Sequence, residues 1–299
     1  MSQSRLQGVI AASITPVTPD HQIDVPRLAA HIGQLLAKGC SHVSTFGTTG
    51  EGASFATGQK VAALQALKAM GVDMGRQVPA IMTPVLDDAV RSLVAYRELG
   101  CRAVLVLPPF YYGATEAGIA GFYDALIERT SGASDIDLLL YNIPQLSRVK
   151  FTKSLVETIL SRHGSRIVGI KDSTGDIENG LMLVESFRNL AIFTGDDRVL
   201  PTLVSKGGAG MIGGMPNVFA SDLKALYDNP GNREILDKQA KRIVAVDNHG
   251  SLVALKAALA HYGGDEDLAR ALPPLQALDA KQRASLIALF EDTGFRAAA

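Results

Sequence analysis

Residues 103–109 read Ala-Val-Leu-Val-Leu-Pro-Pro, and this stretch sets the pattern for most of the chain. Five consecutive apolar residues, with no polar residue alternating among them, are typical of a strand buried on both faces of a parallel sheet. The two prolines cannot continue the hydrogen bonding of a strand, so they mark its end. Helical periodicity precedes the stretch and returns at about residue 116, which predicts an α–β–α order around it.

The same unit recurs on both sides of this stretch. Amphipathic helical segments separate seven further apolar runs, at residues 9–14, 42–46, 78–83, 136–141, 167–171, 191–194 and 210–212. Eight βα units without a linker predict a closed (β/α)8 barrel of the α/β class rather than an open doubly wound sheet. Within this pattern, Asp87 or Asp88 is expected to cap the helix that ends at Gly100.

Only helical patterns follow Phe219, at roughly 221–228, 232–246, 250–262 and 280–291. A barrel does not need all of these helices. We therefore expect a catalytic barrel over residues 1–225 and a C-terminal helical extension over residues 226–299 that packs on it.

The composition excludes several classes of protein. The chain of 299 residues has a formal net charge of −1, which gives no electrostatic basis for binding nucleic acid or an anionic membrane. No apolar segment approaches a membrane span, and the N-terminus does not resemble a signal peptide, so we expect a soluble cytoplasmic protein. The cysteines, Cys40 and Cys101, stand at the starts of predicted strands and are expected to be inert core residues. The scattered histidines form no zinc motif.

In a (β/α)8 barrel the active site lies where the strands end. Lys171 ends the apolar run Val-Gly-Ile-Lys (residues 168–171), so its amine is expected in the barrel mouth. Burial lowers the pKa of a lysine, and a neutral amine can form a Schiff base with a ketone. The alternative is a structural lysine that reaches solvent or pairs with Asp172.

Two neighbouring strand ends carry further candidates. Tyr141 ends the preceding strand, where its phenol could act as an acid or base beside Lys171, although taken alone it is better explained as an ordinary aromatic residue at the rim. Gly-Thr-Thr-Gly-Glu (residues 47–51) ends the second strand, and its backbone amides and hydroxyls suit a small carboxylate. Taken alone, this segment also fits a plain turn.

Two other motifs are discounted. Residues 208–213 match Gly-x-Gly-x-x-Gly, but a helix precedes and a strand follows, the reverse of a dinucleotide site, so we interpret them as close packing. Asp196 and Asp197, with Asp172, could hold magnesium. Helix capping or hydrogen bonds to substrate hydroxyls explain them better.

The motifs taken together are more specific than any one of them. They are Gly-Thr-Thr-Gly-Glu (47–51), Pro-Phe-Tyr-Tyr (109–112), Tyr-Asn-Ile-Pro (141–144), Gly-Ile-Lys-Asp (169–172) and Gly-Asp-Asp (195–197). This ordered set resembles the dihydrodipicolinate synthase / N-acetylneuraminate lyase family of pyruvate-dependent class I aldolases. The resemblance covers nearly the whole chain.

The resemblance implies a role for each matched residue. Lys171 is similar to the Schiff-base lysine that captures pyruvate or another 2-oxo acid, and Tyr141 to the general acid/base. Thr48 and Thr49 are similar to the hydroxyl relay and carboxylate-binding pair. Tyr111 resembles a relay tyrosine lent across a subunit interface, which implies a homo-oligomer such as a dimer of dimers. The remaining substrate contacts are expected from Gly47, Gly195, Asp196, Ile212 and Gly213, and the resemblance implies no cofactor and no metal.

The substrate branch stays open at this stage. In the synthases of the family, an arginine that binds the carboxylate of aspartate semialdehyde stands five residues after the tyrosine, where this chain has Leu146. Arg148 is two residues further on and could replace it only with a different loop. We expect an aldolase or a related dehydratase that acts on a 2-oxo-3-deoxy, often sugar-derived, acid, with 4-hydroxy-tetrahydrodipicolinate synthase as the alternative. Two further rivals are a metal-dependent class II aldolase and a catalytically silent barrel that binds 2-oxo acids.

Overall fold

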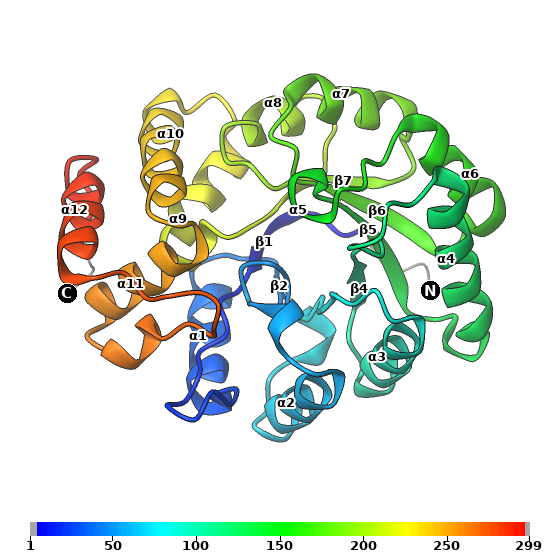
Figure 1. The fold of residues 1–299 in the computed structure, drawn as a ribbon. Helices are drawn as coiled ribbons and strands as arrows, with labels where there is room; N and C mark the ends of the chain where they lie inside the picture. Colours follow the sequence, from blue (N-terminus) through cyan, green and yellow to red (C-terminus); the bar gives the residue numbers. More distant parts are fainter. Residues whose placement is uncertain (1–4, 297–299) are drawn as a thin grey trace.

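A computed structural model describes residues 5–296 and shows a barrel of parallel strands surrounded by helices (Figure 1). The predicted (β/α)8 fold is confirmed. The strands are β1 (Gly8–Ala12), β2 (His42–Ser44), β3 (Ala80–Ile81), β4 (Ala103–Val106), β5 (Asp137–Asn142), β6 (Ile167–Asp172), β7 (Ala191–Thr194) and β8 (Gly210–Gly213). The helices are α1 (Val25–Ala37), α2 (Thr57–Ala69), α3 (Leu86–Leu99), α4 (Glu116–Arg129), α5 (Pro144–Ser147), α6 (Lys153–His163), α7 (Ile177–Ser186), α8 (Leu200–Ser205), α9 (Pro216–Asp228), α10 (Arg233–Asn248), α11 (Leu252–Gly263) and α12 (Ala280–Glu291).

Backbone hydrogen bonds close the barrel between β2 and β3. The regular ladder runs in the order β2-β1-β8-β7-β6-β5-β4-β3, which leaves those two strands at its ends. The amide of Val78 donates to the carbonyl of Val43 at 2.9 Å, and the amide of Ala80 donates to the carbonyl of Thr45 at 2.8 Å. The third strand is shorter than the run at 78–83 predicts, because only Ala80–Ile81 has regular ladder pairing.

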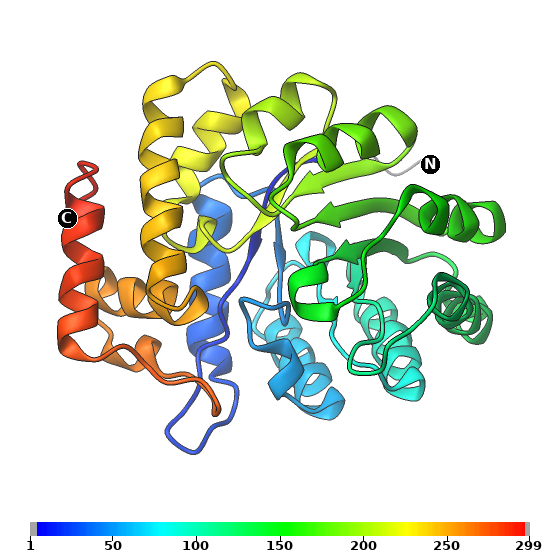
Figure 2. The ribbon, with the colours of Figure 1, turned by 45° about the horizontal axis from the view of Figure 1, so that its top comes forward.

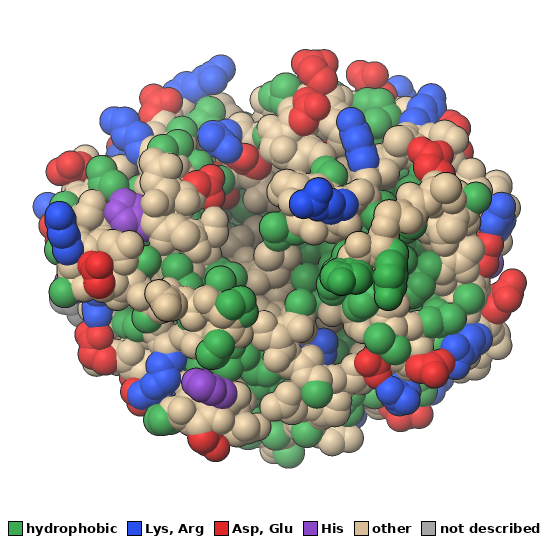
Figure 3. All heavy atoms as spheres, in the orientation of Figure 1, with side chains coloured by type: hydrophobic (Ala, Val, Ile, Leu, Met, Phe, Trp, Pro, Cys, Tyr) green, Lys and Arg blue, Asp and Glu red, His purple; other side chains and the backbone are tan. Residues whose placement is uncertain are grey.

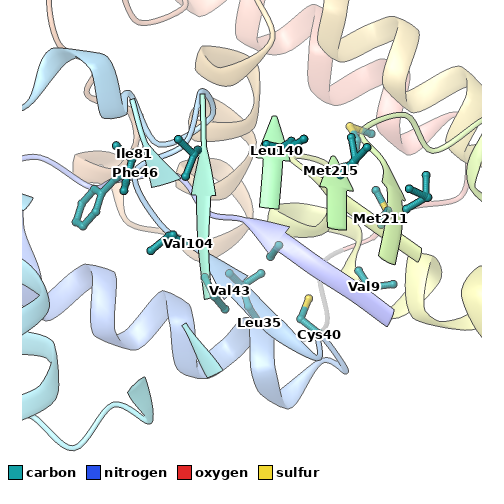
Figure 4. Close-up of a cluster of buried hydrophobic side chains, with 14 of the residues drawn as sticks. Val9, Leu35, Cys40, Val43, Phe46, Ile81, Val104, Leu140, Met211 and Met215 are labelled. Atoms are coloured by element: carbon teal, nitrogen blue, oxygen red, sulfur yellow. The ribbon is translucent and has the colours of Figure 1, made fainter. Parts of the chain in front are cut away.

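Alternate side chains of each strand enter two different cores. One core fills the barrel and includes Ile10, Leu105 and Phe193. The other lies between the strands and the helices, and Figure 4 shows it with side chains such as Val9, Val43, Val104, Leu140 and Met211 from the strands. Both faces of each strand are therefore buried, which explains why the runs are apolar throughout rather than alternating.

The two cysteines lie in the core between strands and helices, as predicted. Both are buried and free, and burial raises the pKa of each thiol, Cys40 and Cys101, to about 12. A thiol with such a pKa carries little of the reactive thiolate near neutral pH.

The glycine-rich stretch at 208–213 packs strands closely, as predicted. Gly210 begins β8 with φ of 134°, and a Cβ atom there would lie 2.1 Å from the carbonyl oxygen of Gly8 on β1. Only glycine allows the two strands to approach this closely. The stretch therefore serves the barrel wall and does not open a helix.

The C-terminal helices lie together along one side of the barrel (Figures 1 and 2). Helix α9 spans the expected boundary between residues 225 and 226, so a division there would cut a helix, and α10 begins at Arg233. Within residues 5–296 no single helix has the length and apolarity for a membrane crossing; α10 and α11 pass that test as a pair, bent by 111°.

The capping predictions for aspartates are wrong in two places. Helix α3 begins at Leu86 after Val85, so Asp87 and Asp88 lie inside its first turn, where their charges favour the helix dipole. Helix α8 begins at Leu200 without a side-chain cap, and Asp196 instead accepts a hydrogen bond from the amide of Arg198.

Candidate active site

A pocket of about 570 Å³ opens where the strands end, and the face that holds the barrel mouth is hollowed near its centre (Figure 3). The strand-end loops supply one wall, and α10 and α11 supply the opposite one. The predicted site residues that line it are Thr48, Thr49, Tyr141, Lys171, Gly195, Asp196, Ile212 and Gly213. The predicted residues Gly47 and Tyr111 do not line it.

Lys171 lies next to Tyr141 at the base of this pocket. The two residues pair across β5 and β6, and the side chain of Lys171 reaches over the tyrosine ring, with Nζ 4.1 Å from its centroid. Lys171 is 4% exposed, and within residues 5–296 no carboxylate pairs with it. The alternative of a pair with Asp172 is wrong, because that carboxylate accepts hydrogen bonds from other side chains, those of Asn142, Thr174 and Asn179.

The phenol of Tyr141 is hydrogen-bonded to Thr48. Their oxygens are 3.0 Å apart, and either hydroxyl can be the donor. Tyr141 itself is buried, so this bond fixes the phenol in the pocket. A hydroxyl pair of this kind can pass a proton from one oxygen to the other, and it ends beside the amine of Lys171.

The loop that carries the threonines is built by its own backbone. The amides of Gly50 and Gly52 donate to the carbonyl of Gly47, and the amide of Glu51 donates to the carbonyl of Thr48. The amides of residues 50–52 are therefore used inside the turn, and Gly47 shapes it through its carbonyl. Thr48 and Thr49 are the residues of this loop that line the pocket, and the substrate contact expected from Gly47 stays a prediction.

Tyr111 lies outside the pocket of its own chain. It follows β4 with φ of 88°, is 87% exposed, and packs edge-to-face against Tyr112 with ring centroids 5.2 Å apart. Figure 3 shows hydrophobic side chains gathered beside the hollow on this side of the molecule. Within its own chain, Tyr111 does not line the pocket. Its catalytic role therefore stays a prediction.

The chain is similar to known proteins over most of its length. A model of the dihydrodipicolinate synthetase family matches residues 5–292. The chain belongs to this family. It is 33% identical over 224 residues, 74% of each chain, to a DapA-like lyase of Chloroflexus aurantiacus.

Solved structures of the family have the same fold. A dihydrodipicolinate synthase from Agrobacterium tumefaciens superposes with a TM-score of 0.90 at 28% identity, covering 97% of this chain and 99% of that one. A 2-keto-3-deoxygluconate aldolase variant of Sulfolobus solfataricus gives a TM-score of 0.85 at 24% identity and 96% coverage of both chains. The protein is therefore a lyase of the dihydrodipicolinate synthetase family.

Lys256, which lies behind the site, was not predicted from the sequence. Lys256 of α11 forms an ion pair with Glu51, and neither side chain is exposed to solvent. Lys256 also donates to the carbonyl of Arg270 at 2.7 Å, while Glu51 accepts from the amide of Leu272 at 2.7 Å. The signal in the sequence is a single charge inside the apolar run Leu-Val-Ala-Leu-Lys-Ala-Ala (252–258), which requires a buried partner.

The two aspartates after β7 have different surroundings. Asp196 lines the pocket and is held by Arg198 through two side-chain hydrogen bonds of 3.0 and 2.6 Å. Asp197 is fully buried behind it and accepts from Gln239 of α10 at 3.0 Å. Burial, reinforced by the neighbouring charge of Asp196, raises the pKa of Asp197 well above its usual value. Among residues 5–296, no group of three or more His, Cys, Asp or Glu side chains is placed to hold a metal ion.

Proposed function

We propose that the protein is a pyruvate-dependent class I aldolase in which Lys171 forms a Schiff base with a 2-oxo acid. The observation that carries this proposal is the position of its amine: enclosed at the barrel mouth, without a carboxylate partner among the described residues, and against Tyr141. A buried amine without a salt bridge is poorly placed for a structural role and well placed for nucleophilic addition.

The chemistry follows from the imine. The amine of Lys171 adds to the C2 carbonyl of a 2-oxo-3-deoxy acid, and water leaves to give an iminium ion. The C3–C4 bonding electrons move into this iminium to form an enamine, while Tyr141 takes the proton of the C4 hydroxyl and an aldehyde departs. The enamine regains a proton at C3, and water then hydrolyses the imine to release pyruvate and the free amine. Condensation is the same sequence in reverse.

The remaining pocket residues have supporting roles in this proposal. Thr48 relays the proton that Tyr141 takes, since their oxygens are in hydrogen-bond contact. The hydroxyl of Thr49, with the walls formed by Ile212, Gly195 and Gly213, holds the carboxylate end of pyruvate next to the imine. The iminium ion serves as the electron sink, so the scheme uses no metal or organic cofactor.

The synthase alternative has one observation for it and one against it. Its support is the 28% identical Agrobacterium tumefaciens structure, a dihydrodipicolinate synthase. Against it, Leu146 lines the pocket where a cation is needed for the carboxylate of aspartate semialdehyde, and Arg148 is not among the lining residues. A sugar-acid dehydratase would start from the same imine, so product analysis separates it from an aldolase.

Reductive trapping tests the proposal directly. The protein is incubated with pyruvate and borohydride, and the intact mass and tryptic peptides are measured. We expect one reduced pyruvyl group, on Lys171, and none in Lys171→Ala. Lys60→Gln is the matched control, because Lys60 is also buried and burial lowers the pKa of its amine to about 8. An unchanged mass, or a label on Lys60, would refute the proposal.

We further propose a homo-oligomer, a dimer or a dimer of dimers, in which Tyr111 completes the site of a neighbouring subunit. The exposed ring of Tyr111 and its distance from its own pocket support this arrangement. Mixing Lys171→Ala and Tyr111→Phe subunits should restore part of the activity that each variant lacks, because one hybrid site then has both native residues. A fully active monomer, or no recovery on mixing, would contradict it. The cytoplasmic location stays a prediction.

A further inference from the structure

The pocket has an inner and an outer end, and different parts of the chain build them. The inner end, around Lys171 and Tyr141, comes from the strands. The outer end is walled by the C-terminal extension, through Val246 and Asp247 of α10 and Ser251 before α11. If pyruvate is bound at Lys171, the aldehyde half of the substrate must extend toward this outer wall.

The charges of the pocket are unevenly distributed between the two ends. Its charged lining residues are Lys171, Asp196, Arg198 and Asp247. The guanidinium of Arg198 is held by both carboxylate oxygens of Asp196, and the proposed reaction uses Lys171 for the imine. The carboxylate of Asp247 is then the unmatched charge of the outer end, since no ion pair to it is formed within residues 5–296.

Asp247 lies at the pocket mouth beside Ser251. The hydroxyl of Ser251 donates to Oδ1 of Asp247 over 3.4 Å, which leaves the other carboxylate oxygen for a ligand. Ser251 has φ of 56° and ψ of −103°, a backbone conformation that residues other than glycine rarely adopt. Such strain persists where the surrounding structure fixes it, often beside a ligand. Partial burial and the nearby Asp196 raise the pKa of Asp247, while the hydrogen bond from Ser251 and the charge of Arg198 act in the opposite direction.

A carboxylate of this kind discriminates between substrates by charge. Hydroxyl groups donate hydrogen bonds to it, and hydrogen bonds to charged acceptors are stronger than neutral ones. An aldehyde ending in a carboxylate or phosphate would instead meet Asp247 and Asp196 with no uncommitted cation among the described lining residues. Repulsion of this type acts mainly on selectivity.

We propose that Asp247, supported by Ser251, determines specificity at the outer end of the pocket: it selects aldehydes whose far end carries neutral hydroxyl groups over aldehydes that end in an anion. This inference rests on the proposed aldolase function and narrows it to neutral, hydroxylated aldehydes. The helical extension then supplies substrate recognition as well as packing.

The test measures kcat/KM for condensation of pyruvate with glyceraldehyde, glyceraldehyde 3-phosphate and succinate semialdehyde. We expect the native protein to prefer glyceraldehyde by about tenfold or more, the size of one hydrogen bond to a charged group. Asp247→Ala should lower kcat/KM for glyceraldehyde about tenfold, mainly through KM. Asp247→Asn keeps the shape of the side chain and removes its charge. It should raise kcat/KM for the two anionic aldehydes, relative to glyceraldehyde, about three- to fivefold; the effect is small because water screens an exposed charge.

The controls separate this inference from the aldolase proposal. Asp237→Asn, on the exposed face of α10 and away from the pocket, should leave all three values unchanged. Borohydride trapping of pyruvate should remain native-like in every variant. No adduct in the native protein would overturn the aldolase function and this inference together. An adduct combined with no aldehyde turnover, with preference for an anionic aldehyde, or with equal responses of Asp247→Asn and Asp237→Asn would overturn this inference alone.

Discussion

Two buried lysines, Lys171 and Lys256, lie near opposite ends of the loop of residues 47–51, and their surroundings differ. Lys171, at the end of β6, has an aromatic ring beside its amine and no carboxylate partner within residues 5–296. Lys256, on α11, is paired with Glu51 and also donates to the carbonyl of Arg270. The loop of residues 47–51 joins the two sites, because Thr48 faces Tyr141 and Glu51 faces Lys256.

The difference between the two lysines shows that burial alone does not determine the role of a lysine; its partners do. Removing a lysine from water costs free energy in both places, but a partner of opposite charge offsets that cost only at Lys256. For Lys256, desolvation lowers the pKa while Glu51 opposes the change, so the charge is held for structure. At Lys171 no such pair is formed within residues 5–296, which supports the covalent role that we propose for its amine. The same substitution at each lysine should therefore have opposite consequences.

The largest expected effect is on activity at the unpaired lysine. Lys171→Met should abolish both turnover and pyruvate trapping, since no other described group lines the pocket with an amine. Its free energy of unfolding should change by less than about 1 kcal/mol, because the lost cation–π contact and the relieved desolvation oppose each other. Assays with borohydride trapping and denaturant titration check both values. A large loss of stability would make Lys171 a structural lysine like Lys256.

The next largest effect distinguishes the role of Tyr141 from that of the Lys171 amine. Tyr141→Phe should lower kcat by roughly 10²- to 10⁴-fold, the usual contribution of a general acid or base. Borohydride should still trap pyruvate on Lys171, since the nucleophile is intact. Thr48→Val, which removes the hydrogen bond to the phenol, should give a smaller loss in the same direction. Near-native kcat in Tyr141→Phe would remove the tyrosine from the proposed mechanism.

At the paired lysine the expected effect is on stability. Lys256→Met leaves Glu51 buried without its cation and should cost about 3–5 kcal/mol of unfolding free energy. The double variant Lys256→Met/Glu51→Leu should recover much of that loss, because apolar residues can replace a buried pair. Lys224→Met, which breaks an exposed pair with Asp228, is the control and should change stability by about 0.5 kcal/mol or less. A single variant as stable as this control would show that the buried pair is dispensable.

The smallest expected effect is on the pH dependence of stability, and it comes from the buried and uncharged His31. Burial lowers the pKa of His31 to about 4, although its hydrogen bond with Asn217 acts in the opposite direction. Between pH 6.5 and 4 the unfolded chain binds a proton that the folded chain does not, so stability falls as the pH drops, by up to about 3 kcal/mol. His31→Gln should flatten this part of the curve, and the exposed His21→Gln is the control. Parallel curves for His31→Gln and the native protein would contradict the assignment.

Much of the inner site was predictable from the sequence. Strand-end position placed Lys171 and Tyr141 in the barrel mouth, and the structure pairs the two residues across β5 and β6. The contact expected from Gly47 stays a prediction, since this residue builds the turn with its carbonyl and does not line the pocket. The same reasoning failed for the aspartate caps, since helix ends shift by a few residues and a side chain then meets a different amide.

The sequence by itself determined the barrel, its extension and the lysine at the strand end, because these follow from local periodicity and from which residues end each apolar run. Tertiary structure alone decided which charges meet. Glu51 and Lys256 are 205 residues apart, and Asp247 reaches the pocket only because α10 packs over the barrel mouth. Pairing and specificity depend on distances between remote segments, and no local pattern encodes these distances.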